Sequence, residues 1–223
     1  CQSPGVPFCR PHEMRGENVV VKLLDDVEFR NNYFKLYQNG ILDYCTSISP
    51  YVQDECTNIM DIGCGIGLVP LLLFNRCTVK PNFWLLDKSI DIREMERAHL
   101  NGYAGGFHSD NYIFTASLQV TYNFFTMNGI EADRIHLLEV DQGVFNKVPK
   151  LDLILSRNSW GFHYPISTYI DDVCLKLKKT GRVIIDVRKD TDGLEILSDK
   201  FSHVKVASDS KKSNTVIASN SPI

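Results

Sequence analysis

Residues 60–74 read MDIGCGIGLVPLLLF, and no other stretch of the sequence says as much about the architecture. An apolar, strand-like run ends in three closely spaced glycines, and a second apolar run follows. Glycine adopts the backbone conformations that a tight turn requires, and Pro70 falls in the first turn of the expected helix, where its missing N–H costs little. The stretch therefore predicts a strand, a glycine turn and a helix.

Short apolar runs recur downstream of this turn, and helical patterns separate most of them. Strands that alternate with helices form right-handed crossovers and a mostly parallel sheet with both faces covered. The last two runs are joined by the polar turn DSKKSN, which is too short for a crossover and predicts a C-terminal antiparallel hairpin. We expect a doubly wound α/β fold with a seven-stranded sheet. The expected strands are 57–62, 82–87, 134–140, 151–156, 181–187, 203–208 and 214–219, and the expected helices are 68–76, 117–128, 167–179 and 193–201.

Composition narrows the class of protein. The 223 residues are 43% hydrophobic and 23% charged, values typical of a globular domain rather than a disordered or membrane protein. No run approaches the ~18 consecutive apolar residues of a transmembrane helix, and the first residues lack the apolar region of a signal peptide, so we predict a cytoplasmic protein without a membrane partner. The net charge of −3 gives no basic face, so nucleic acid is not expected as a partner. The seven scattered cysteines predict neither a disulfide framework nor a zinc site.

The domain organisation is expected to be simple. Residues 1–17 contain three prolines and no periodicity, which predicts a flexible leader. Residues 18–223 are expected to form a single domain. Within it, residues 18–56 predict helices that cover one side of the sheet. Residues 89–117 are longer than one crossover helix requires, and their glycines, aromatics and His108 predict either a lid over a substrate pocket or a disordered connector.

Acidic residues at the ends of the first two expected strands indicate the ligand. In open α/β sheets, ligands bind at the carboxyl ends of the strands, and Asp87 ends its strand 20 residues after Gly67, where a carboxylate can accept hydrogen bonds from a ribose. The glycines follow G-x-G-x-G rather than the dinucleotide pattern, and Asp61 beside them would repel a diphosphate but suit an ammonium group. A nucleoside carrying an amino acid fits both acids. Alternatively, the glycines only form a turn and the aspartates cap helices, which explains each residue but not their joint spacing.

The segments DIGCGIG and LLDKS resemble the first two motifs of the class I S-adenosylmethionine-dependent methyltransferases, which have a Rossmann-like fold. The order of elements extends this similarity from about residue 57 to the end of the sequence. The resemblance implies S-adenosylmethionine as cofactor, S-adenosylhomocysteine as product, and a last strand inserted antiparallel between its neighbours. It also implies that the glycine turn wraps the methionine part, Asp61 lies near its amino group, Asp87 holds the ribose and Asp141 meets the adenine amino group. The cofactor-binding set is Asp61, Gly63, Cys64, Gly65, Gly67, Asp87, Lys88, Asp141, Gln142 and Ser156.

The loop expected after the fourth strand, SRNSWGFHYPIS at 156–167, should supply the acceptor site. It resembles neither the loops of enzymes that methylate bases nor those of metal-dependent catechol-type enzymes, which leaves metal-independent transfer to oxygen, or to a nitrogen outside nucleic acid. His163 is the candidate general base, since histidine has an ordinary pKa near ~6.5, although the same residues also suit a structural aromatic cluster. Arg157 either binds an anionic acceptor or pairs with Asp186. The expected substrate-binding residues are Asn158, Trp160, Tyr164 and His108.

These observations predict an enzyme that methylates a hydroxyl group of a small molecule, such as a sugar or another polyhydroxylated metabolite whose ring stacks on an aromatic side chain. Two alternatives stay open. One is a methyltransferase that acts on RNA or protein with a partner subunit, and the other is a non-catalytic nucleoside-binding module of the same fold. The sequence makes no prediction of the oligomeric state.

Overall fold

The structure is a computed structural model that describes residues 39–74, 77–88 and 118–223. Nearly all of them belong to one compact unit, Ile41–Ser89 with Ala116–Ile223. The predicted leader (1–17), the predicted lid (89–117) with His108, and the first part of the predicted helical cover lie outside the described residues, so these assignments stay predictions.

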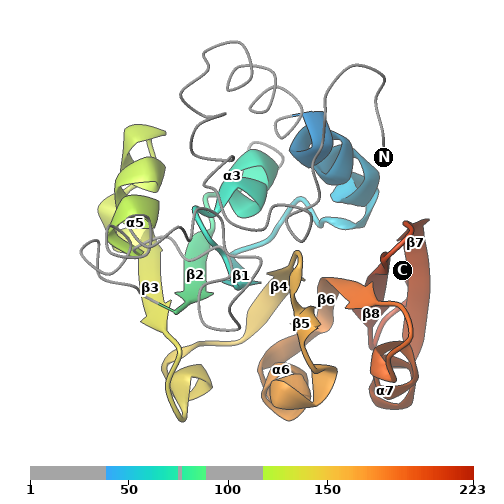
Figure 1. Cartoon of the computed structure of the whole chain (residues 1–223). Coiled ribbons are helices and arrows are strands. Elements are labelled where there is room, and N and C mark those ends of the chain that lie inside the picture. Colours follow the sequence, from blue (N-terminus) through green and yellow to red (C-terminus); the bar gives the residue numbers. More distant parts are fainter. Residues whose placement is uncertain (1–38, 75–76, 89–117) are drawn as a thin grey trace, which may run out of the picture. The chain divides into compact units, whose positions relative to one another are not determined.

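The described unit alternates strands and helices along most of its length (Figure 1). The described residues start with helical residues 39–48 and a 3-10 turn, η2 (Ser49–Tyr51). The remaining elements are β1 (Asn58–Ile62), α3 (Leu68–Phe74), β2 (Asn82–Asp87), α5 (Leu118–Met127), η3 (Ala132–Arg134), β3 (Ile135–Glu139), η4 (Val144–Lys147), β4 (Leu151–Ser156), β5 (Ser159–Tyr164), η5 (Ile166–Thr168), α6 (Ile170–Lys176), β6 (Leu177–Arg188), α7 (Gly193–Lys200), β7 (His203–Asp209) and β8 (Ser213–Ser219).

Seven strands form one sheet in the order β3-β2-β1-β4-β6-β8-β7. The pairs from β3 to β6 are parallel, whereas β8 pairs antiparallel with both β6 and β7. The order reverses at β1, where β2 lies on one side and β4 on the other. The doubly wound sheet and the C-terminal hairpin are confirmed, and β8 lies between its neighbours as the resemblance implied.

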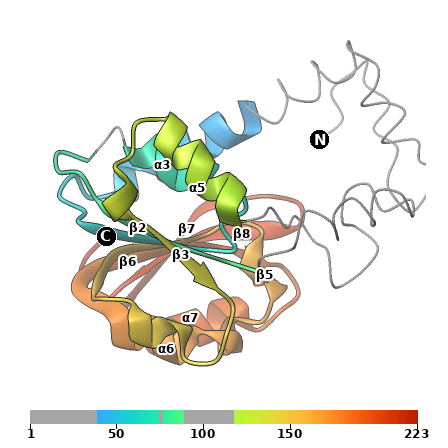
Figure 2. The same cartoon turned by 90° about the vertical axis from the view of Figure 1, so that its left-hand side faces the viewer.

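Both faces of the sheet are buried, because successive residues of the central strands enter different cores. On one face, strand residues such as Ile59 and Leu153 pack with helix 39–48, α3 and α5. On the other, their neighbours Met60 and Ile154 pack with α6, α7 and η4. Figure 2 shows α3 and α5 on one side of the sheet and α6 and α7 on the other. This two-sided burial leaves the carboxyl ends of the parallel strands as the natural place for a ligand.

Two predicted boundaries are wrong. The helix expected over 167–179 ends at Lys176, and β6 begins at Leu177, four residues before the expected strand. The strand continues there because the buried Leu177 pairs with Leu151, while Lys178 reaches the carboxylate of Asp152 at 2.8 Å. The expected loop 156–167 contains β5, a strand that is not one of the seven in the sheet.

Within the described ranges, no helix combines the length and the apolar character needed to cross a membrane.

Candidate functional site

The glycine turn after β1 folds over the end of β2. Gly63, Gly65 and Gly67 all have positive φ, at 74°, 53° and 72°, which L side chains rarely adopt. The backbone N–H groups of Gly63 and Cys64 both donate to the carbonyl oxygen of Leu86, at 2.8 and 3.1 Å. The three predicted glycines are therefore required by the backbone of this turn.

Neighbouring elements approach the same glycines closely. A Cβ atom on Gly63 would lie 1.9 Å from Oγ of Ser159, and one on Gly67 would lie 2.4 Å from the ring of Phe125. The first contact places the start of β5 against the turn, and the second packs α5 against it. Because β5 begins here, the segment predicted to carry the acceptor site borders the predicted cofactor turn.

The carboxylate of Asp87 holds the turn from the end of β2. Its Oδ2 atom accepts the backbone N–H of Gly65 at 2.6 Å, and its Oδ1 atom accepts the N–H of Lys88 at 2.7 Å. From α5, the hydroxyl of Thr121 donates to the carbonyl oxygen of Gly65 at 2.7 Å. Burial raises the pKa of Asp87 to about 6, although the two backbone hydrogen bonds act in the opposite direction.

Asp61 is a second acidic residue beside the turn, and its side chain is buried in β1. Burial, and then the negative charge of Asp87, raise the pKa of Asp61 to about 8. Burial of Cys64, and then the charges of Asp87 and Asp61, raise the pKa of the Cys64 thiol. Among the residues that the structure describes, no Lys or Arg forms an ion pair with either carboxylate. The two acids therefore form a site suited to a positive charge with hydrogen-bond donors.

The other predicted cofactor residues lie at the ends of neighbouring strands. Ser156 is buried, and its hydroxyl donates to the carbonyl oxygen of Ile62 at 2.8 Å, which joins the ends of β4 and β1. Asp141 and Gln142 follow β3 and are exposed. The carboxylate of Asp141 accepts from Nζ of Lys147 at 2.9 Å. The hydroxyl of Ser156 is thus used within the sheet, whereas Asp141 and Gln142 face solvent.

The corner between β4 and β5 is fixed by Asp186 of β6. The backbone N–H of Asn158 bonds the Asp186 carboxylate, and the hydroxyl of Thr215 in β8 donates to its Oδ1 atom at 2.8 Å. Burial raises the pKa of Asp186, and the Arg157 charge partly offsets this. The Arg157 guanidinium lies over the ring of Tyr44, 4.8 Å from its centroid. No ion pair joins Arg157 to Asp186 within the described residues, so both roles predicted for Arg157 stay predictions.

Trp160 does not have the predicted role. Its side chain is fully buried among the core residues, and its indole N–H donates to the carbonyl oxygen of Ile166 at 3.0 Å. A ring that is covered on all sides and hydrogen-bonded internally cannot stack on an acceptor. The prediction that Trp160 binds substrate is wrong, and the residue anchors β5 to the core instead.

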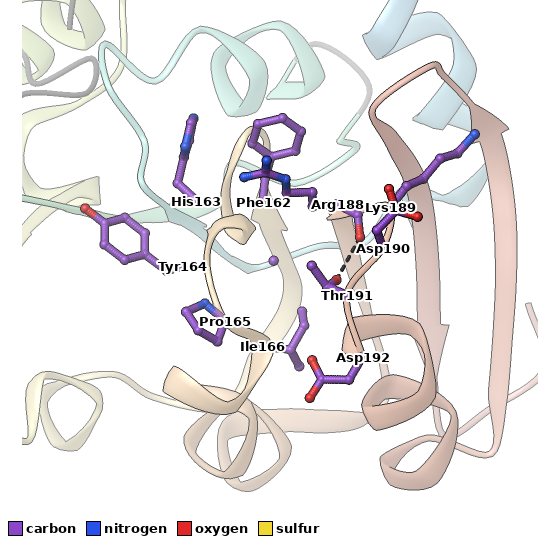
Figure 3. Close-up of a pocket in the computed structure, with 11 residues that line it drawn as sticks. Phe162, His163, Tyr164, Pro165, Ile166, Arg188, Lys189, Asp190, Thr191 and Asp192 are labelled. Atoms are coloured by element: carbon purple, nitrogen blue, oxygen red, sulfur yellow. Dashed lines mark hydrogen bonds between the residues drawn. The ribbon is translucent and has the colours of Figure 1, made fainter. Parts of the chain in front are cut away.

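A cavity of about 410 Å³ lies between β5 and the loop that joins β6 to α7 (Figure 3). Predicted residues His163 and Tyr164 line it, and Tyr164 is 48% exposed. Burial, followed by the positive charge of Arg188, lowers the pKa of His163, which favours its neutral imidazole. The complete lining consists of Gly161, Phe162, His163, Tyr164, Pro165, Ile166, Arg188, Lys189, Asp190, Thr191 and Asp192.

The sequence analysis missed the contribution of residues 188–192 to this cavity. A usable signal was present, since these residues directly follow the predicted strand 181–187, and ligand sites in such sheets lie beyond the carboxyl ends of strands.

Comparison with solved structures identifies the fold. The structure is similar to a precorrin-6y C5,15-methyltransferase of Geobacter metallireducens, with a TM-score of 0.55 and 17% identity over 82% of this chain and 89% of that chain. It is similar to the mitomycin 7-O-methyltransferase, with a TM-score of 0.51 and 11% identity over 92% of this chain and 61% of that one. It is also similar to a 16S rRNA N2 G1207 methyltransferase of T. thermophilus, with a TM-score of 0.50 and 12% identity over 74% and 37% of the two chains. No protein-family model and no curated protein matches the sequence.

These likenesses, together with the strand order and the antiparallel β8, show that the described unit has the class I methyltransferase fold. The names of these proteins give different methyl acceptors for the same fold. The acceptor of this chain must therefore be argued from its own residues.

Proposed function

We propose that the protein is an S-adenosylmethionine-dependent methyltransferase that binds its cofactor at the glycine turn. The observation that carries the proposal is the pair formed by Asp61 and Asp87, two buried acids beside a glycine turn in a class I methyltransferase fold. When bound, S-adenosylmethionine supplies an electrophilic methyl group on a sulfonium sulfur.

The donor and acceptor chemistry of the turn suits this cofactor. An ionised Asp61 would hold the ammonium of the methionine part. Each carboxylate oxygen of Asp87 accepts one backbone N–H, and a carboxylate has about four lone-pair sites, so two remain for the two hydroxyls of a ribose. We assign the adenine amino group to Asp141, whose exposed carboxylate lies beyond the end of β3.

We further propose that the acceptor is a small molecule, such as a sugar or another polyhydroxylated metabolite, bound in the cavity beside β5 and methylated on a hydroxyl without a metal ion. A volume of about 410 Å³ falls in the range of small-molecule sites. The neutral imidazole of His163 would accept the hydroxyl proton as the oxygen attacks. Tyr164 offers an exposed ring for stacking, in place of Trp160.

Two alternatives remain. An RNA or protein acceptor would require a partner, because the net charge of −3 offers little attraction for a phosphate backbone. A non-catalytic module would bind the cofactor without transferring its methyl group.

Calorimetric titration with S-adenosylmethionine, S-adenosylhomocysteine and NAD tests the cofactor assignment. We expect saturable binding of the first two and weaker binding of NAD. Tighter binding of NAD would contradict the proposal and favour a dehydrogenase. Transfer of labelled methyl groups to a metabolite library, in parallel with RNA and protein extracts, separates the three acceptor hypotheses.

A further inference from the structure

We infer that the cavity between β5 and the β6–α7 loop binds an anionic group, carboxylate or phosphate, through the guanidinium of Arg188. Calling this group part of the methyl acceptor rests on the proposed function. The anion site itself rests only on the geometry of the cavity.

Arg188 is a basic residue that lines the cavity. Its side chain is exposed, and it forms no ion pair within the part of the chain that the structure describes. Its Cζ atom lies 5.9 Å from the ring centroid of Phe162, so the ring supports one side of the guanidinium (Figure 3). The adjacent Lys189, in contrast, is paired with Asp209. Arg188 is therefore the cation in this lining that is free to meet a ligand.

The lining holds two basic residues, Arg188 and Lys189, and two acidic residues, Asp190 and Asp192. Figure 3 shows Arg188 beside Phe162, and Asp192 at the opposite end near Ile166. Arg188 is also the charged residue whose field acts on His163. The guanidinium beside Phe162 is therefore the positive group that an anion in this cavity can reach, away from Asp192.

The geometry selects a planar or tetrahedral oxyanion. A guanidinium presents its N–H groups as a flat fork that matches two oxygens of a carboxylate or phosphate. Pro165 and Ile166 provide an apolar wall for the carbon skeleton of the same ligand. The ligand class is a small hydroxylated acid or phosphate ester. Arg188 thus takes the anion-binding role that the sequence had offered to Arg157.

The test uses NMR titration of the full-length, isotope-labelled protein with three probes: 4-hydroxybenzoate, its uncharged methyl ester and phenyl phosphate. We expect the two anions to shift the amide resonances of Gly161 and Thr191 saturably. We expect the ester to bind at least about 10-fold more weakly than the acid, because it lacks the charge-assisted hydrogen bonds. The relative affinities of the carboxylate and the phosphate then identify the preferred anion.

Two variants make the test specific to Arg188. Arg188→Gln should weaken anion binding about 10-fold to 100-fold. The matched control Lys211→Gln removes the same charge from the exposed β7–β8 turn and should leave binding unchanged. Equal binding of acid and ester, unchanged binding by Arg188→Gln, or the absence of shifts with both anions would each overturn the inference.

A parallel titration with S-adenosylmethionine keeps the two proposals distinguishable. Arg188→Gln should bind this cofactor as the wild type does, because Arg188 is not part of the glycine turn. If wild type binds the anions but not S-adenosylmethionine, the proposed function fails and the anion site stands. If wild type binds S-adenosylmethionine and Arg188→Gln does not weaken anion binding, the anion site fails and the proposed function stands.

Discussion

The carboxylate of Asp87, at the end of β2, accepts the backbone N–H of Gly65 at 2.6 Å. This hydrogen bond couples the conformation of the glycine turn to the position of the acid. The acid proposed to hold a ribose also shapes the turn proposed to wrap the methionine part.

This coupling makes Asp87 the first residue to test. Asp87→Ala should weaken S-adenosylmethionine binding by about 30-fold to 1,000-fold, because it removes hydrogen bonds to a charged acceptor and releases the turn. Isothermal titration calorimetry measures the loss. Asp199→Ala, on the exposed side of α7, is the matched control and should bind normally. An unchanged affinity for Asp87→Ala would refute the cofactor assignment.

The raised pKa of Asp61 predicts an unusual dependence of stability on pH. Its pKa is about 8 in the folded protein against an ordinary value of 3.8, so the folded state holds an extra proton between these limits. The free energy of unfolding should then fall as pH rises through this window, by at most about 1.4 kcal/mol per pH unit for this group.

Urea denaturation of the wild type and of Asp61→Asn between pH 6 and 8 measures this effect. Asparagine cannot ionise, so the difference between wild-type and mutant unfolding free energies should decrease with increasing pH. Comparing the two proteins cancels the histidines, whose lowered pKa values act with the opposite sign. A difference that is constant or increases with pH would show that Asp61 ionises normally.

His163 is expected to act as a general base. His163→Gln should lower kcat by about 100-fold to 10,000-fold and leave cofactor affinity nearly intact, because glutamine keeps a hydrogen bond but cannot take the proton at neutral pH. Since burial and Arg188 lower the pKa of His163, the acid limb of the kcat/KM profile should lie below pH 6.5 and disappear in the mutant. Turnover within about threefold of wild type would leave His163 a structural residue.

The amino ends of the strands, opposite the glycine turn, should contribute to the stability of the fold and not to cofactor binding. At the start of β4, the carboxylate of Asp152 accepts the backbone N–H groups of Thr57 and Asn58 at 2.9 and 3.0 Å and pairs with Lys178 at 2.8 Å. Asp152→Ala should lower the free energy of unfolding by about 3 kcal/mol, because it leaves these donors without their acceptor.

Burial acts to raise the pKa of Asp152, but its hydrogen bonds together outweigh this and lower the pKa. Its contribution to stability is therefore present above the ordinary value of 3.8 and is lost as pH falls below it. Chemical denaturation at pH 7 measures the loss in Asp152→Ala. Cofactor affinity, measured under conditions in which the variant is folded, should not change. A large drop in affinity would mean that the two ends of the strands are coupled.

The sequence predicted best where burial alone determines the structure. The runs 82–87 and 151–156 match β2 and β4 residue for residue, because strands covered on both faces are continuous apolar segments. Leu177 and Lys178 were misassigned because their strand conformation depends on pairing with Leu151 and on the carboxylate of Asp152, both distant in sequence. Such tertiary contacts override local propensity.

The candidate site was predictable only in part for a similar reason. A glycine turn and its acids are local patterns, and Asp61, Asp87 and Gly65 lie where the pattern indicated. Whether an aromatic residue lines a cavity or fills a core is not a local property, and Trp160 proved to be core. Arg188 directly follows a predicted strand, but its position beside Phe162 depends on tertiary structure and could not be predicted from the sequence.

The position of β8 between β6 and β7 has a consequence for synthesis of the protein. A ribosome releases residues 203–209 before residues 213–219, yet β7 joins the sheet through β8. Until β8 has emerged, the edge of β6, with buried residues such as Val183 and Ile185, has no strand to cover it. An uncovered apolar edge is a template for pairing with other chains, so nascent molecules pass through an interval of high aggregation risk in which chaperones would have most effect.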